Sequence, residues 1–214
     1  MPVQFFTYFR NNYLRSVIYA PAIISLFSAL PVAADVRDGE RAYRAKDYAV
    51  AYQELLPAAE AGNAEAQFLL SQVLRLGAGV SGASKEADRT ASDLWLHRAA
   101  ERGYGKALES VGQEFHDKYD YEKAFEYSLR AAKADGESGT WMLGFMYCFG
   151  EGVPRDSLEA DAWKAVSFHP FTHNVAAWQG LQCEVGATVT QEYLLRVNRR
   201  AEEIRRQYNL PSEF

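Results

Sequence analysis

The chain has 214 residues, which is enough for one domain with a sizeable hydrophobic core. Hydrophobic residues make up 48 % of it and charged residues 24 %, which is the ordinary globular range and excludes a collagen-like, disordered or multi-span membrane protein. The formal net charge of −5 argues against a nucleic-acid partner, because phosphates require a basic patch on the protein.

The first 34 residues have the pattern of a secretory signal peptide. They contain no Asp or Glu, they carry Arg10 and Arg15, and a mostly apolar run follows over residues 17–30. Small residues end the segment, so we expect cleavage after Ala34 and export to the periplasm. The alternative is an uncleaved membrane anchor, although the apolar run is short for a membrane span of about 20 residues.

A short motif recurs three times after this segment. It reads AAEAG at residues 58–62, AAERG at residues 99–103 and AAKADG at residues 131–136, and its glycines are 41 and 33 residues apart. Paired alanines let a second helix approach closely, and glycine ends a helix because it adopts the left-handed conformation at little cost. Periods of this size are typical of helix-pair repeats.

Each motif ends one predicted helix, and a second helix follows it. We expect the first helices of the pairs near residues 37–60, 90–101, 121–134 and 157–168. The second helices of the first three pairs contain residues 66–71, 107–112 and 139–144, each with small residues at both ends where a helix pair makes close contact.

The end of the chain departs from this pattern. The fourth pair has Ser167 and Phe168 where an alanine pair would stand. A last helix is predicted near residues 190–207, with Thr188 or Thr190 as its N-cap. An atypical end is expected in a repeat array, because the terminal element must cap the core.

The loops between the pairs complete a family pattern. GEGV at residues 150–153 leads to Asp156 and to an Ala-x-x-Trp segment at residues 160–163, and GAGV at residues 77–80 leads to a similar segment at residues 92–95. Together with the Ala-Ala-x-x-Gly helix ends, these features resemble Sel1-like repeats. Those repeats are relatives of tetratricopeptide repeats, which fold as stacked antiparallel helix pairs.

The resemblance covers residues 37–168 and implies an all-α fold, a right-handed superhelical solenoid of about four helix pairs plus a C-terminal capping helix. It divides the chain into a signal peptide (1–34), a Sel1-like repeat solenoid (35–169) and a C-terminal capping segment (170–214). The chain departs from the family in an insertion within residues 81–89, in a middle loop without glycine and in the degraded fourth pair.

The resemblance also implies a function in protein binding. Similar proteins serve in envelope assemblies, flagellar motors, polysaccharide export and secretion systems, and some are immunity proteins that block a toxin. We therefore expect a periplasmic adaptor that docks a partner protein on its solenoid surface, without catalysis and without a cofactor. Two alternatives stay open, a membrane-associated structural component of an envelope or flagellar motor complex, and a hydrolase with an unrecognised site.

Three tyrosines are candidates for the partner-binding surface. In tetratricopeptide-like solenoids the first helices of the pairs line the concave face, which binds partners. Tyr43, Tyr48 and Tyr52 lie on the predicted first helix, and the last two are four residues apart and share a helical face. The alternative interpretation is that these rings fill the core.

The arginines of the last helix offer a second candidate surface, for an acidic partner or an anionic membrane. The alternative is a solvated capping helix, because its late arginines suit the negative end of the helix dipole.

The sequence lacks the usual motifs of catalysis and metal binding. Neither Gly-x-Gly loop has the third glycine or the lysine of a phosphate-binding loop, and no Gly-x-Ser-x-Gly occurs. His169 and His173 are four residues apart, and Cys183 follows ten residues later. Pro170 lies between the histidines and breaks the helix that would place them on one face, so no metal site is predicted.

The two cysteines are Cys148 and Cys183. An even number of cysteines in an exported chain permits one disulfide, and the alternative is two buried free thiols.

Overall fold

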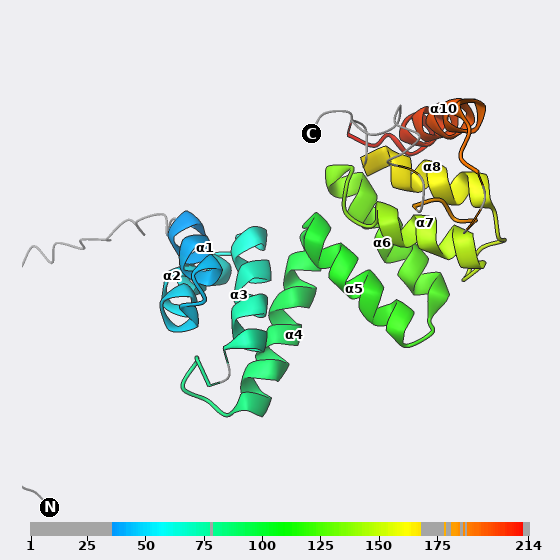
Figure 1. Cartoon of the computed structure of the whole chain (residues 1–214). Coiled ribbons are helices and arrows are strands. Elements are labelled where there is room, and N and C mark those ends of the chain that lie inside the picture. Colours follow the sequence, from blue (N-terminus) through cyan, green and yellow to red (C-terminus); the bar gives the residue numbers. More distant parts are fainter. Residues whose placement is uncertain are drawn as a thin grey trace, which may run out of the picture. The chain divides into compact units, whose positions relative to one another are not determined.

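Every element of regular structure in the described part of the chain is an α-helix (Figure 1), so the all-α prediction is confirmed. The computed structural model describes residues 36–77, 79–167, 178, 181–184, 186 and 188–211. The chain divides into two units, residues 1–32 and 33–214, and all described residues belong to the second. The predicted signal peptide lies outside the described residues. No helix among those described is long and apolar enough to cross a membrane.

Each helix packs mainly on the helices that precede and follow it in the chain (Figure 1). The helices are α1 (Val36–Arg44), α2 (Tyr48–Glu60), α3 (Ala64–Leu76), α4 (Lys85–Glu101), α5 (Gly105–Asp117), α6 (Tyr121–Asp135), α7 (Thr140–Phe149), α8 (Ser157–Ser167) and α10 (Gln191–Tyr208). The last of them, α10, packs on α8.

The recurring glycines end helices, as the repeat predicts. Gly62, Gly103 and Gly136 all have positive φ, at 91°, 80° and 78°, in the turns after α2, α4 and α6. A short polar side chain starts the helix that follows the first of these glycines. Asn63 accepts a hydrogen bond from the backbone N–H of Ala66 at 2.9 Å, which satisfies one of the unpaired donors at the start of α3.

The predicted first helix, residues 37–60, is two helices rather than one. Lys46 adopts a left-handed conformation with φ of 62°, and Asp47 then caps α2 through the backbone N–H of Val50. The helix α1 folds back on α2, and the two come so close that a Cβ on Gly39 would lie only 2.5 Å from the Leu55 side chain. A residue with no side chain is what permits this contact.

The second departure concerns the predicted insertion, residues 81–89. Ser84 caps α4 through the backbone N–H of Ala87, so α4 begins at Lys85 rather than near residue 90. Much of the insertion therefore extends a helix and does not lengthen the loop.

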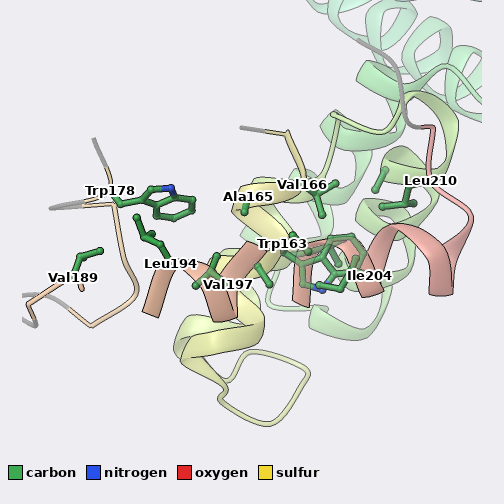
Figure 2. Close-up of a cluster of buried hydrophobic side chains, with 13 residues drawn as sticks. Trp163, Ala165, Val166, Trp178, Val189, Leu194, Val197, Ile204 and Leu210 are labelled. Carbon is green, nitrogen blue, oxygen red and sulfur yellow. The ribbon is translucent and has the colours of Figure 1, made fainter. Parts of the chain in front are cut away.

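Among the described residues, the largest hydrophobic cluster lies where α8 meets α10 (Figure 2). Trp163 on α8 is fully buried there with Val166, and α10 contributes Leu194, Val197 and Ile204. Each fully buried side chain of this size contributes roughly 1.5–3 kcal/mol through loss of water contact. The predicted last helix is thus α10, with Thr190 as its N-cap, and its apolar face covers α8.

Candidate protein-binding surface

The three predicted tyrosines are half-buried, and the structure uses them partly as packing residues. Tyr43 on α1 and Tyr48 and Tyr52 on α2 contact the core that α2 and α3 share. The rings of Tyr43 and Tyr48 are 6.2 Å apart. Their role in partner binding stays a prediction, and a more exposed set of aromatic rings lies elsewhere in the chain.

The exposed side of α7 consists of three aromatic residues. Trp141, Phe145 and Phe149 are 40 %, 42 % and 59 % exposed, and α7 has no other exposed residue. Their spacing of four places them along one face of the helix. The opposite side of α7 is buried through Leu143 and Met146. A helix that is apolar on both sides is normally covered on both sides, so this exposed face is a candidate binding surface.

Aromatic rings from the α5–α6 region extend this face. The His116 ring meets Phe145 edge-on with centroids 5.8 Å apart, and Phe145 contacts Phe149 at 4.3 Å. On its other side His116 contacts Tyr121, which meets Tyr119 edge-on. We call His116, Tyr119, Tyr121, Trp141, Phe145 and Phe149 the aromatic surface.

A cavity of about 350 Å³ opens within the aromatic surface. Its walls come from α5, α7 and α8, and they are Gln113, His116, Trp141, Met142, Phe145 and Lys164. Its volume lies in the range of pockets that accept a small molecule or one large apolar side chain.

A carboxylate holds the imidazole of this surface in place. His116 Nε2 lies 2.8 Å from Oε2 of Glu151, which follows α7 in the chain. Partial burial, and then the negative charge of Glu151, raise the pKa of Tyr121. These contacts orient two polar groups at the rim of an apolar surface, as is common in protein interfaces.

Glycines on the inner side of α7 fix which side faces outward. Gly139 begins the helix with φ of 78°, and a Cβ there would collide with the backbone oxygen of Ser128. A Cβ on Gly144 would lie 2.7 Å from the backbone oxygen of Ala160 on α8. Because the small residues let α6 and α8 approach on this side, the three aromatic residues are left on the other.

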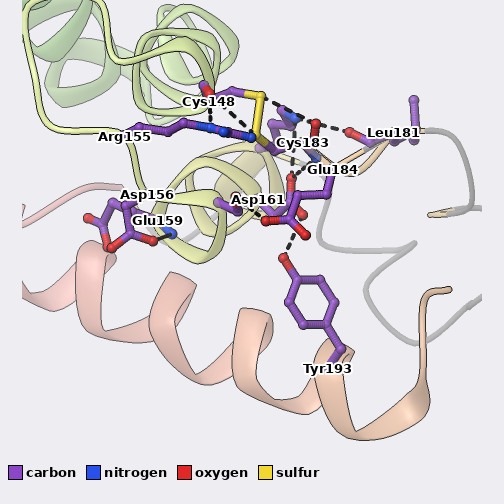
Figure 3. Close-up of a disulfide and its surroundings, with 11 residues drawn as sticks. Cys148, Arg155, Asp156, Glu159, Asp161, Leu181, Cys183, Glu184 and Tyr193 are labelled. Carbon is purple, nitrogen blue, oxygen red and sulfur yellow. Dashed lines mark hydrogen bonds and ion pairs between the residues drawn. A yellow bond between two sulfur atoms is a disulfide. The ribbon is translucent and has the colours of Figure 1, made fainter. Parts of the chain in front are cut away.

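A disulfide and a buried carboxylate hold the end of α7 (Figure 3). Cys148 is bonded to Cys183, with Cα atoms 5.4 Å apart. The backbone N–H of Cys183 donates to Oδ1 of Asp161 at 2.8 Å, and the hydroxyl of Tyr193 donates to Oδ2 at 2.8 Å. Lys164 Nζ pairs with the same carboxylate at 3.2 Å.

This carboxylate connects three parts of the chain. Asp161 on α8 is fully buried, and its partners come from the segment around Cys183 and from α10. Burial and the hydrogen bond to Asp161 raise the pKa of Tyr193 well above its ordinary value. Every oxygen of the buried charge has a partner, which a stable buried carboxylate requires.

No group of three or more His, Cys, Asp or Glu side chains in the described ranges could hold a metal ion. His169 and His173 lie outside those ranges. His97 is 3.8 Å from Glu114 on the surface.

The basic last helix uses part of its charge internally. Arg200 on α10 pairs with Glu159 on α8 at 2.6 Å and with Glu203 at 3.0 Å. Arg205 pairs with Glu202 and donates to the backbone oxygen of Val166. These two arginines fasten α10 to α8, which reduces the positive charge available to an outside partner.

No family model matches the chain, and no curated protein matches it.

Proposed function

We propose that this chain is an exported protein-binding adaptor, an α-solenoid of Sel1-like repeats that docks a partner protein on its aromatic surface. The observation that carries the proposal is the exposed side of α7, where Trp141, Phe145 and Phe149 are the only exposed residues of the helix. Exposed aromatic residues of this density are typical of interface centres, where tryptophan and tyrosine contribute most of the binding energy.

Two further features support the solenoid and the compartment. Consecutive helices pack on one another, with left-handed glycines at the recurring helix ends, as Sel1-like repeats require. The Cys148–Cys183 disulfide is the kind of cross-link that persists in oxidising compartments such as the periplasm. This agrees with the signal peptide that we infer for residues 1–34.

The mechanism is docking without chemistry on a substrate. The rings of the aromatic surface are held by their contacts with one another and with Glu151, so little side-chain entropy is lost when a partner covers them. The cavity between α5 and α7 would accept one apolar side chain of the partner. Within this class, an immunity protein would bind one toxin one-to-one, whereas an assembly factor would join several envelope proteins.

The test is affinity capture from envelope extract with the chain from Asp35 onward and a C-terminal tag. We would compare the parent chain with the double variant Trp141→Gln/Phe145→Gln. Truncating aromatic residues at an interface centre costs roughly 2 kcal/mol or more each, so binding of the captured partner should weaken at least a hundredfold. The measurement is the Kd of the purified pair by calorimetry.

Two matched variants make the result specific. Leu94→Gln changes an apolar residue on α4 that is similarly exposed but lies outside the aromatic surface, and should leave the Kd unchanged. Tyr48→Gln tests the alternative surface on α2. Loss of binding in Tyr48→Gln with none in the double variant would move the site to α2. Recovery of no protein partner, even after cross-linking, would contradict the adaptor function.

A further inference from the structure

A second cavity, with polar walls, lies between α2, α3 and α4. Its volume is about 440 Å³, and none of its walls belongs to the aromatic surface. The walls are Ala59, Glu60, Gln67, Trp95, Arg98, Glu101 and Arg102. Residues of three consecutive helices, and of the turn after α4, therefore converge on one cavity.

Two arginines of this cavity have no carboxylate partner among the described residues. The guanidinium of Arg98 lies over the Trp95 ring, 4.7 Å from its centroid, which restrains it without neutralising its charge. The Arg102 guanidinium covers Gly62, where a Cβ would lie 2.8 Å from its terminal nitrogen. Neither forms an ion pair within 4.0 Å with any carboxylate in the described part of the chain. A planar guanidinium is well suited to bind a carboxylate.

The same cavity has a buried hydrogen-bond acceptor without a donor. Gln67 is 3 % exposed, and its Nε2 donates to the backbone oxygen of Ala59 at 3.0 Å. That bond fixes the amide, and the Gln67 Oε1 atom has no partner in the described residues. Buried amide oxygens are nearly always hydrogen-bonded, so this oxygen is free to accept an N–H group from a ligand in the cavity.

The charges of the cavity restrict the kind of ligand. Glu60 and Glu101 line it together with Arg98 and Arg102, so its formal charges balance. A bare anion would meet the two glutamates as well as the two arginines. A ligand that carries a carboxylate next to amide N–H donors can place the carboxylate on the arginines and an N–H on the Gln67 oxygen.

We propose that this cavity binds a peptide through a carboxylate, with the carboxylate on Arg98 and Arg102 and a neighbouring backbone N–H on Gln67. Two sources present such a carboxylate beside a backbone amide. They are a chain terminus and an Asp or Glu side chain. The site is independent of the aromatic surface, so either can fail without the other.

The test is an NMR titration of the ¹⁵N-labelled chain from Asp35 onward, which follows the indole N–H signal of Trp95. The variant Trp95→Phe assigns that signal. The probes are acetyl-trialanine with a free carboxylate, acetyl-Ala-Asp-Ala amide, acetyl-trialanine amide and sodium acetate, each to about 10 mM because small peptides of this kind bind with millimolar Kd. A fifth probe is the free-acid peptide methylated on its last amide nitrogen.

We expect the free acid, the Asp peptide or both to shift the Trp95 signal, and whichever does so identifies the source of the carboxylate. The neutral amide and acetate should leave it unchanged, and the methylated peptide should bind at least about tenfold more weakly. Arg98→Gln should weaken binding of the active probe by about tenfold or more. Arg89→Gln, an exposed arginine of the same helix outside the cavity, should not.

Absence of any shift with both carboxylate peptides would overturn the proposal. So would an equal shift with the neutral amide or acetate, or an unchanged Kd in Arg98→Gln. Capture of a partner on the aromatic surface would be unaffected by these outcomes.

Discussion

Single small residues control how the helices approach one another. Gly112 on α5 and Gly144 on α7 occupy the same position of the repeat, but their surroundings differ. A Cβ on Gly144 would lie 2.7 Å from the Ala160 backbone oxygen, whereas on Gly112 its nearest neighbour would be Ser128 Oγ at 3.1 Å. A backbone oxygen cannot move away without separating two helices, while a hydroxyl can rotate.

This difference predicts opposite results for the same substitution. Ala is a better helix former than Gly by about 1 kcal/mol, which favours both variants. We expect Gly144→Ala to lower the free energy of unfolding by up to roughly 2 kcal/mol, because an overpacking cost of roughly 1–3 kcal/mol outweighs that gain. Gly112→Ala should be neutral or slightly stabilising. Urea unfolding followed by circular dichroism measures both, and equal effects would show that the α7–α8 contact is not tight.

Among the helices, α7 is packed on one side and exposed on the other. Its inner side packs on α8, its outer side is the aromatic surface, and its last turn is cross-linked through Cys148. The segment around Cys183 is bound by that disulfide and by Asp161 on α8. The same carboxylate accepts from Tyr193, so the start of α10 is held from the same point.

Loss of the disulfide should therefore loosen the C-terminal elements first. The cross-link joins residues 35 apart, and closing a loop of that length contributes about 3–4 kcal/mol. We expect the double variant Cys148→Ala/Cys183→Ala to lose about that much stability in urea unfolding. Reducing agent should lower the stability of the parent to the same level and leave the variant unchanged. Equal stability of the double variant and the parent without reducing agent would contradict the prediction. It would mean that the disulfide does not restrain the unfolded chain to the extent that the loop length implies.

Across the described residues as a whole, contacts are mostly between neighbours in the chain. The buried residues form separate clusters, one within α2 and α3 and another that includes α8 and α10. In an array of this kind stability is the sum of local terms and nearest-neighbour terms, so a disturbance weakens with distance along the chain.

A core substitution near the start of the chain tests this property. Leu55 on α2 is fully buried, and Leu55→Ala should cost about 2–5 kcal/mol through the cavity that it leaves. We expect faster hydrogen exchange in α1, α2 and α3, and little change in α8 and α10. Exchange followed by mass spectrometry resolves these segments. A uniform increase over all helices would instead indicate one cooperative core.

Local chemistry made the helix ends predictable from the sequence. The glycines after the alanine pairs and the cap residue Thr190 act on their own neighbouring backbone groups, so their effect does not depend on distant residues. The break in the predicted helix 37–60 was missed because its helical pattern continues across Lys46. In the structure Asp47 caps α2 at this turn, and α1 folds back so that Gly39 meets Leu55.

The sequence by itself determined the all-helical class and the glycine turns after three of the helices, and a signal for the aromatic surface was also present in it. The small residues Gly139 and Gly144 mark the inner side of α7, and Trp141, Phe145 and Phe149 fall on the other side. Only the tertiary structure decided which rings stay exposed and how the second cavity forms. Gln67 on α3 and Arg98 on α4 line the same cavity because of the way these two helices pack, and the repeat spacing does not fix that packing.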